Sequence, residues 1–334
     1  MHRRVTPFET PVRAFWHDET IKCTGVNILE GTVTPISVLE FKPIELSDRE
    51  WMEECFRAGH RGSLEYSFTN LFVWRKALNI QVARYEGYAI VMSNPDTPSY
   101  VFPMGRGPLL PVLEAMLEYS RSIGHPLCFN TLLEGDRLRL EALFPGRFEI
   151  KEIRWAFDYV YETERLINLS GKKLSQKRNN INKFSKEYRD WDFEEITRAN
   201  IDEVWDMSRK WAEMMDTGDD QSLHEELSAL EETFRHFEAL NMQGGLIRAN
   251  GRVIAFSIGD PLNEDVYLVQ FEKAYPDIPG AYQVINQQFA EHYAAGYKFV
   301  NREDDTGDEG LRKAKLSYDP IYLVAKYSAR QITP

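Results

Sequence analysis

The sequence predicts an α/β (α+β) protein built from two mixed domains of the same kind in tandem. Its 334 residues, of which 43% are hydrophobic, are enough for two domains of ordinary size with their own cores. The order strand, helix, three-strand meander, helix, strand is found twice along the chain, without a run of identical residues. In each copy a helix stops at a glycine and a short apolar strand then ends at an asparagine, over residues 124–130 and 296–301.

Residues 1–40 show no clear periodicity and are expected to be an N-terminal extension. The first domain is expected at residues 41–160. Its first strand, at 41–46, leads into a capping-box pattern at 47–50 that favours a helix to about residue 58. Further strands are expected at 79–85, 88–93, 100–103 and 126–130, and an amphipathic helix at 109–123.

The second domain is expected at residues 161–330 and repeats this order. A short strand at 193–196 precedes a second capping-box pattern, at 200–203, which opens a helix. Asn250 and Gly251 are typical of a hairpin turn. Strands are expected at 246–248, 253–259, 266–271 and 297–301, and a helix at 282–294.

The most unusual stretch of the sequence follows the last of these strands, at residues 301–320. Five acids fall within its first nine residues, and a basic segment and the sequence SYDP complete it. A strand that ends in dense ionisable groups and a glycine-bounded turn is typical of the sites of α/β proteins. The second domain is therefore predicted to carry the site, because the strand at 126–130 of the first half has no comparable acid cluster.

Acyl transfer to an amine needs a base for the ammonium proton and a donor that polarises the carbonyl. Glu303 and Asp304 lie just beyond a strand end and are candidate bases, and Tyr318 is a candidate acid toward the leaving group. Candidate substrate contacts in the same stretch are Asn301, Arg302, Lys313 and Lys315. A structural alternative has equal weight: the acids pair with the basic residues that follow and fix the loop.

A basic helix is predicted around residues 172–186. Its apolar residues recur at helical spacing on one face, which leaves the basic residues to cover the remainder. On a chain of net charge −12, such a strip attracts an anion locally, whether tRNA, a lipid phosphate, a CoA diphosphate or a nucleotide-sugar. The alternative is an ordinary solvated helix face. The candidate anion-binding residues are Lys172, Lys173, Lys177 and Arg178.

Several function classes are disfavoured by what the sequence lacks. The seven histidines and three dispersed cysteines show no metal-ligand spacing, so no metal site is expected, and the cysteine usage fits the cytoplasm. No apolar run is long enough for a transmembrane segment, and the net charge argues against general nucleic-acid binding. The motifs of serine hydrolases, P-loop proteins, zinc proteases and dinucleotide-binding proteins are absent.

Three segments resemble an uncharacterised bacterial family that shares the C-terminal aminoacyl-transfer domain of phosphatidylglycerol lysyltransferase. They are YSFTNLFVWR at 66–75, GKKLSQKRNNINKF at 171–184 and NREDDTGDEGLRKAKLSYDP at 301–320. The end of the chain, GLRKAKLSYDPIYLVAKY, is more distantly similar to Fem-type aminoacyltransferases. The element order is that of the GNAT acyltransferase fold. The resemblance thus implies two tandem GNAT-like acyl-CoA N-acyltransferase domains with mixed, mostly antiparallel sheets.

The loop at residues 275–282 corresponds to the place where GNAT enzymes that use acyl-CoA hold the pyrophosphate on backbone N–H groups. Here prolines at 276 and 279 remove two of those donors. An ordinary strand-to-helix loop is the alternative. The candidate cofactor-binding residues are Gly280, Ala281 and Tyr282.

The resemblance implies transfer of an acyl or aminoacyl group to an amine- or hydroxyl-bearing acceptor, with acyl-CoA or aminoacyl-tRNA as donor substrate and no permanently bound cofactor. Two alternatives stay open: a CoA-dependent N-acetyltransferase of small amines, and a non-catalytic ligand-binding or regulatory protein on a duplicated scaffold. The expected partner is an anionic small molecule or tRNA. Oligomeric state is left open.

Overall fold

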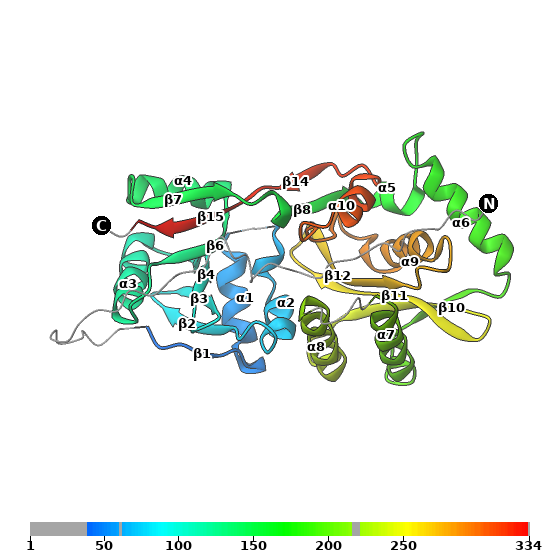
Figure 1. Ribbon diagram of the computed structural model, residues 1–334, viewed down its shortest axis with the longest axis horizontal. Helices are drawn as coiled ribbons and strands as arrows, with labels where there is room; N and C mark the ends of the chain where they lie inside the picture. The colour runs from blue at the N-terminus through cyan, green and yellow to red at the C-terminus, as the bar shows by residue number, and fades with distance from the viewer. Residues whose placement is uncertain (1–38, 60–61, 216–220, 333–334) are drawn as a thin grey trace. The chain divides into compact units, whose positions relative to one another are not determined.

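The computed structural model describes residues 39–59, 62–215 and 221–332 (Figure 1). The described residues divide into two compact units, one of Asp158–Leu323 and one of residues 39–157 with 324–332. Each unit is a mixed α/β structure around its own sheet, which confirms the predicted fold class. Of the predicted extension at 1–40, residues 1–38 lie outside the described residues.

The first unit is built on a sheet with strand order β1-β2-β3-β4-β6-β15-β7, to which β5 is added beside β3. Its neighbouring strands are antiparallel except for β4 and β6, which run parallel. The strands are β1 Lys42–Pro43, β2 Gln81–Tyr85, β3 Tyr88–Ser93, β4 Ser99–Val101, β5 Met104–Gly105, β6 Cys128–Leu133, β7 Phe148–Glu152 and β15 Lys326–Gln331. The helices are α1 Arg49–Arg57, α2 Phe68–Trp74, α3 Leu109–Ser122 and α4 Glu134–Leu143.

The aromatic run at 66–74 forms a helix, although its composition is typical of strands. Ser67 caps α2, because its hydroxyl accepts a hydrogen bond from the backbone N–H of Asn70. Every residue of α2 is buried, so tertiary packing outweighs the intrinsic preference of these side chains. Within this unit, Lys326 Nζ pairs with Glu65 Oε1 at 2.7 Å, and both side chains are almost completely buried.

The second unit is built on a sheet with strand order β14-β8-β13-β12-β11-β10-β9. Within it β12 and β13 run parallel, and the helix α9 connects them. The strands are β8 Asp158–Glu162, β9 Asp192–Glu195, β10 Gln243–Ala249, β11 Arg252–Pro261, β12 Val266–Ala274, β13 Phe299–Asn301 and β14 Tyr322–Val324. The helices are α5 Thr163–Asn168, α6 Ser175–Glu187, α7 Ile201–Met215, α8 Gln221–His236, α9 Ala281–Phe289 and α10 Glu309–Leu316. A single π-helical turn, Ala290–Ala294, extends α9.

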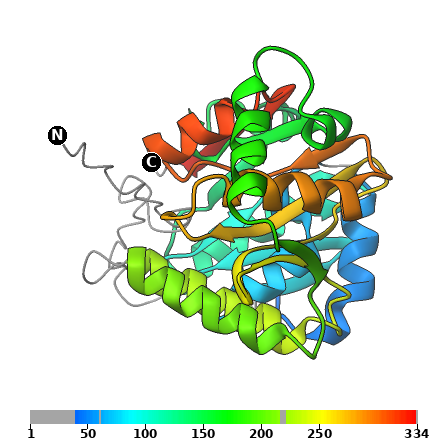
Figure 2. The ribbon, with the colours of Figure 1, turned by 90° about the vertical axis from the view of Figure 1, so that its right-hand side faces the viewer.

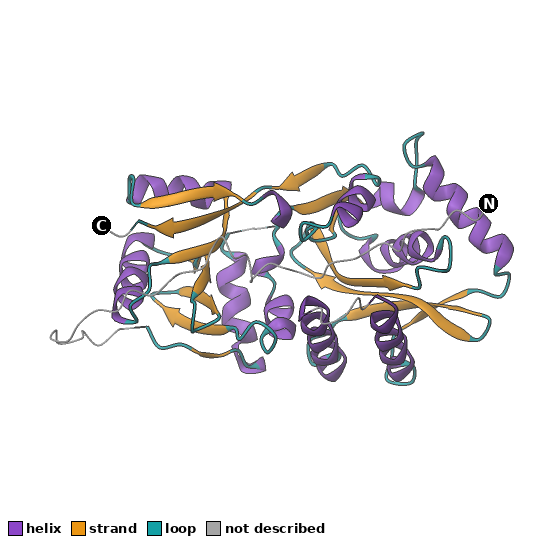
Figure 3. Cartoon of the chain, in the orientation of Figure 1, coloured by secondary structure: helices purple, strands orange, loops and turns teal. Residues whose placement is uncertain are grey.

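Helices cover both faces of the second sheet. The helix α9 packs on β10, β11 and β12, and α6 crosses over α9 (Figure 2). The helix α7 packs on the opposite face, with α8 beside it (Figure 3). The core on the α9 side includes Leu174, Tyr267, Phe289 and Val300, so the apolar face of the predicted basic helix is buried where its spacing indicated.

Two strands, β8 and β15, pair with strands that lie far away in the sequence. After β7 the chain continues into β8, which pairs with β13 of the second sheet. After β14 it continues into β15, which lies between β6 and β7 of the first sheet. The second domain is expected to extend to residue 330, whereas residues 324–332 belong to the first unit. Local pattern identifies such a strand but not the distant edge that it pairs with.

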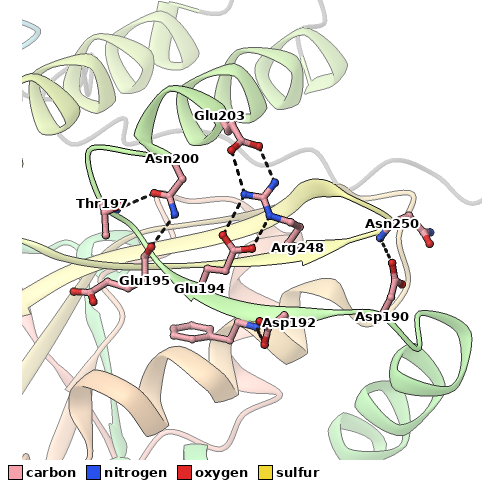
Figure 4. A network of polar contacts seen from close by, with 10 residues as sticks. Asp190, Asp192, Glu194, Glu195, Thr197, Asn200, Glu203, Arg248 and Asn250 are labelled. Atoms are coloured by element: carbon pink, nitrogen blue, oxygen red, sulfur yellow. Dashed lines mark hydrogen bonds and ion pairs between the residues drawn. The ribbon is translucent and has the colours of Figure 1, made fainter.

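The edge of the second sheet is fixed by Arg248 (Figure 4). Its guanidinium Nε lies 2.6 Å from Glu194 of β9, and Nη1 lies 2.7 Å from Glu203 of α7. The predicted capping box at 200–203 is therefore wrong in detail. The Asn200 side chain accepts a hydrogen bond from the backbone N–H of Thr197 instead. The Glu203 carboxylate accepts a hydrogen bond from Arg248.

Candidate active site at the ends of β12 and β13

The parallel strands β12 and β13 separate after a short common stretch. They pair from Val266 with Phe299 to Leu268 with Asn301, after which β13 ends while β12 continues to Ala274. Opposite β11, the register of β12 shifts by one residue between Val269 and Phe271, which marks a β-bulge. Carboxyl ends of adjacent parallel strands are where α/β sheets usually place ligands.

An ion pair joins the two strand ends. Arg302 follows β13 directly, and its Nη2 lies 2.7 Å from Glu272 Oε1 of β12, with each side chain 11% exposed. The second carboxylate oxygen of Glu272 accepts a hydrogen bond from Asn286 Nδ2 of α9 at 2.9 Å. Arg302 Nη1 and Asn286 Oδ1 are buried and have no hydrogen-bond partner in the described part of the chain. The chain therefore presents a spare donor and a spare acceptor around one carboxylate.

Tyr318 lies between two cations. Arg302 Cζ is 4.8 Å from the centroid of its ring, and Lys177 Nζ is 4.2 Å from it. Lys177 also donates a hydrogen bond to Ser317 Oγ at 2.7 Å. Burial raises the pKa of Tyr318, although Arg302 and a hydrogen bond with Gln283 oppose that rise. Burial, with a smaller contribution from Arg302, lowers the pKa of Lys177 to about 8.

Several residues predicted as substrate or catalytic groups are engaged in holding the loop after β13. Asn301 donates to Asp158 Oδ2 at 3.0 Å and accepts from the backbone N–H of Glu303 at 2.7 Å. Asp304 accepts from the backbone N–H of Thr306 at 3.1 Å. Lys315 is buried and donates to the carbonyl of Arg302 at 2.7 Å and to that of Asp304. These three side chains give the loop its shape.

Asp305 and Glu303 of the acid cluster show different features. Asp305 is fully buried and accepts hydrogen bonds from Tyr159 Oη at 2.6 Å and from both sides of the Arg312 fork, at 2.8 and 2.9 Å. Burial opposes ionisation of Asp305, but Arg312 and Tyr159 outweigh it and hold its pKa below the usual value. The feature of Glu303 is its backbone. Its φ of 59° lies in the left-handed region, which is unusual for a non-glycine residue.

The predicted basic residues around α6 lie in different environments. Lys172 and Lys313 are exposed. Lys173 pairs with Asp319 at 2.8 Å. Arg178 turns back to the end of α5, where its Nη1 donates to the carbonyls of Leu169 and Gly171. Of the four candidates before and within α6, the structure brings Lys177 alone beside Arg302 and Tyr318.

The predicted cofactor loop is closed by packing. Gly280, with φ of 94°, approaches α6 so closely that an added Cβ would lie 2.8 Å from the Asn180 carbonyl oxygen and 2.9 Å from Phe184 Cβ. Ala281 is fully buried. Burial raises the pKa of Tyr282 to about 12 despite a hydrogen bond with the backbone of Ala274. The N-terminus of α9 therefore packs closely against α6.

The sequence reasoning missed Glu272, Gln283 and Asn286. Glu272 stands in a strand whose other residues are mostly apolar, and a charged residue inside a buried strand is the signal that identifies it. Gln283 and Asn286 are three apart on α9, hence on one helical face, but nothing local distinguishes them from ordinary polar residues.

Two kinds of feature are absent from the described residues. In residues 39–59, 62–215 and 221–332, no group of three or more His, Cys, Asp or Glu side chains has the arrangement of a metal site. No helix in those ranges combines the length and the apolar character needed to cross a membrane.

Comparison with known proteins identifies the family. The profile described as phosphatidylglycerol lysyltransferase, C-terminal, matches residues 56–330. The chain belongs to this family. The phosphatidylglycerol lysyltransferase C-terminal family was the one expected from the segments at 66–75, 171–184 and 301–320, so that prediction is confirmed. The match includes both units, and the fold is of the acyltransferase type.

Solved structures agree with this family assignment. A conserved protein of unknown function from Bacteroides thetaiotaomicron VPI-5482 is 35% identical, with a TM-score of 0.84 over 88% of this chain and 100% of that one. The C-terminal domain of a putative lysylphosphatidylglycerol synthetase from Agrobacterium fabrum is 16% identical, with a TM-score of 0.62 over 85% and 92% of the two chains. At that identity the likeness shows the fold.

A curated relative is known only as an uncharacterized protein of Mycoplasmoides gallisepticum. It is 25% identical over 184 residues, which are 52% of this chain and 56% of that protein. The chain therefore spans about half the length of the curated relative that it matches.

Proposed function

We propose that this chain transfers an aminoacyl group from an activated anionic donor to a hydroxyl- or amine-bearing acceptor, at the site formed by Arg302, Glu272, Tyr318 and Lys177. One observation carries the proposal. Two cations, Arg302 and Lys177, flank the Tyr318 ring, while Glu272 is the carboxylate bonded to Arg302. These partly buried side chains carry excess positive charge, which favours an anionic ligand. The unpaired guanidinium N–H of Arg302 favours a ligand with a carbonyl or phosphoryl oxygen.

The proposed chemistry follows from the groups at this site. The acceptor oxygen or nitrogen attacks the ester carbonyl carbon, and the bond from that carbon to the donor oxygen then breaks. Arg302 Nη1 stabilises the negative charge that develops on the carbonyl oxygen. Glu303 takes the proton of the acceptor, and Tyr318, kept protonated by its burial, gives a proton to the leaving oxygen. Lys177 holds an anionic group of the donor.

Two observations support these assignments. The left-handed backbone of Glu303 is an unfavourable conformation retained directly beside Arg302, as is common for functional residues. The close contact of Gly280 with α6 disfavours a CoA pyrophosphate at the N-terminus of α9, which favours aminoacyl-tRNA over acyl-CoA as donor. For the same reason the small-amine acetyltransferase alternative is not proposed.

A transfer assay tests the proposal. The purified chain is incubated with charged tRNAs or acyl-CoA thioesters, and with phosphatidylglycerol or a panel of amines as acceptors. We expect transfer from charged tRNA, and we expect Glu303→Gln to reduce the rate at least about a hundredfold, as is typical for loss of a general base. If no donor is turned over while tRNA still binds, the chain is a binding protein on this scaffold, and the enzymatic proposal fails.

A further inference from the structure

The second sheet carries a cavity on its α7 side, which the proposed active site does not use. Neighbouring residues of a strand point to opposite faces of a sheet. Glu272 of β12 bonds to Asn286 of α9, whereas the Lys273 ammonium lies 3.9 Å from the centroid of the Trp211 ring of α7. The helices α7 and α9 lie on opposite sides of the sheet (Figure 1). Tyr275, which follows β12 directly, lines the cavity on the α7 side.

This cavity, here called the α7 cavity, has a volume of about 280 Å³. Ligand sites in proteins usually begin at about 300 Å³, so the α7 cavity suits a small molecule. It is formed by the last turns of α7, the start of β11 and the loop that follows β12. The residues that line it are Lys210, Glu213, Met214, Arg252, Tyr275 and Asp277.

Local structure brings these residues together. Lys210, Glu213 and Met214 are three and four residues apart on α7, so they lie on one face of the helix, and all three are exposed. Arg252 begins β11, and its Cζ lies 5.5 Å from the centroid of the Tyr275 ring. Tyr275 is the one buried residue of the lining, with 6% of its surface exposed. Its ring is therefore the apolar inner wall of the cavity.

Charges of both signs surround the α7 cavity. Two lining residues, Lys210 and Arg252, are cations, and two, Glu213 and Asp277, are acids. Within the described residues none of the four makes an ion pair. A simple anion in the cavity is repelled by the two acids, and a simple cation is repelled by the two basic groups. A ligand that carries one charge of each sign meets a partner for both.

The hydroxyl of Tyr275 is a further polar group at this cavity. A buried tyrosine usually has a hydrogen-bond partner for its hydroxyl. Elsewhere in the described part of the chain the Tyr275 hydroxyl has none. Burial raises the pKa of Tyr275; Arg252 opposes that rise, and Asp277 and Glu213 add to it. The hydroxyl is therefore protonated at neutral pH and can donate a hydrogen bond to a carboxylate in the cavity.

We propose that the α7 cavity binds a free α-amino acid with an apolar or aromatic side chain. The carboxylate of the ligand accepts hydrogen bonds from Arg252 and from the Tyr275 hydroxyl. Its ammonium group lies beside Glu213 and Asp277. Its side chain packs on Met214 and on the Tyr275 ring, which are the apolar parts of the lining. A phosphate-bearing ligand fits less well, because the two acids have no positive group to meet on it.

Calorimetric titration of the whole chain tests this proposal. The ligands are leucine and phenylalanine, two analogues of phenylalanine that lack one of its charges, and inorganic phosphate. We expect leucine and phenylalanine to bind. Phenylalanine amide has no carboxylate and N-acetylphenylalanine has no ammonium group, so each should bind at least about tenfold more weakly than phenylalanine.

Variants of the lining connect binding to the α7 cavity. Arg252→Gln with Glu213→Gln removes one cation and one acid, and we expect phenylalanine to bind at least about a hundredfold more weakly. Tyr275→Phe keeps the ring and removes the hydroxyl, which should weaken binding about tenfold. The matched control is Lys186→Gln with Glu187→Gln, which removes an exposed cation and an exposed acid from α6. It should bind phenylalanine as the unmodified chain does.

Three results would overturn the proposal: neither amino acid binds, phosphate binds more tightly than both, or the α6 control loses as much binding as the cavity variant. Thermal melts of the exposed-residue variants should coincide with that of the unmodified chain, because surface substitutions change stability little. The proposal does not depend on transfer chemistry. A chain that transfers nothing but binds phenylalanine through Arg252 and Glu213 would refute the proposed function and support the amino-acid site.

Discussion

Lys315 donates from its ammonium to the backbone carbonyl of Arg302 at 2.7 Å, so a lysine of α10 holds in place the loop that carries the guanidinium of the proposed site. The ammonium also bonds to the carbonyl of Asp304. A buried ammonium group bonded in this way positions other residues and is not a ligand-binding group.

Lys315→Met should destabilise the protein while preserving the length of the side chain. Two backbone carbonyls lose a charged donor, which should lower the free energy of unfolding by about 3 kcal/mol. Urea denaturation measures this change. Lys313→Met, an exposed neighbour on the same helix, should change it by less than about 0.5 kcal/mol. Equal effects of the two substitutions would show that Lys315 has no special structural role.

Arg302→Lys should separate charge from geometry at the proposed site. Lysine keeps the positive charge beside Glu272 but has no second fork nitrogen to place at the developing oxyanion. We expect kcat to fall about a hundredfold or more, with a thermal midpoint close to that of the unmodified chain. Steady-state transfer kinetics and a melt are sufficient. A variant with full kcat would exclude Arg302 as the carbonyl-polarising group.

Affinity for an anion should depend on pH through Lys177. Its pKa is lowered to about 8, so the ammonium is mostly charged at neutral pH and is lost as pH rises. Binding of inorganic pyrophosphate should therefore be level below about pH 8 and weaken up to about tenfold per pH unit above it. Calorimetric titration across this range measures the profile. Lys177→Arg should flatten it, and an unchanged profile in that variant would assign the dependence to another group.

Gly280→Ala should be more destabilising than a backbone effect alone explains. Gly251 also has positive φ, of 74°, but an added Cβ there meets nothing within 4 Å. Gly251→Ala should therefore cost about 1 kcal/mol for the left-handed conformation. At Gly280 the contacts with Asn180 and Phe184 add to that cost and displace α6. Similar unfolding free energies for the two variants would mean that α6 is not closely packed there.

The buried pair of Lys326 and Glu65 should show strong coupling. Removing one partner leaves a buried charge without compensation, so Lys326→Met or Glu65→Gln should cost about 3–5 kcal/mol. The double variant Lys326→Met with Glu65→Gln should cost less than the two single changes added together. A thermodynamic cycle of unfolding free energies measures the difference. Strict additivity would contradict a direct interaction between the two groups.

The sequence predicts most elements of the meanders well. Tyr88 to Ser93 forms β3 as expected, and the helix expected at 109–123 is α3, Leu109–Ser122. These elements follow from hydrophobic periodicity and from turn residues within a short window. The destinations of β8 and β15 could not be predicted, because strand pairing over long sequence separations leaves no local pattern.

The candidate site was predicted in part. The stretch at 301–320 and the helix around Lys177 do supply Arg302, Tyr318 and Lys177, which the structure brings together. Their partner Glu272 comes from a strand thirty residues earlier, and only the fold places it beside Arg302. Sequence also cannot tell which acid of the loop Arg312 binds, and the structure shows that it binds Asp305.

The position of β15 between β6 and β7 has a consequence for synthesis of the protein. The ribosome delivers residues 39–157 long before residues 326–331, so the first sheet must wait for its inner strand until the second unit has been made. During that interval β6 and β7 present unpaired edges, which invite association with other chains. Loss of Lys326–Gln331 would therefore prevent completion of the first unit, and nascent chains would be more exposed to chaperones than their length suggests.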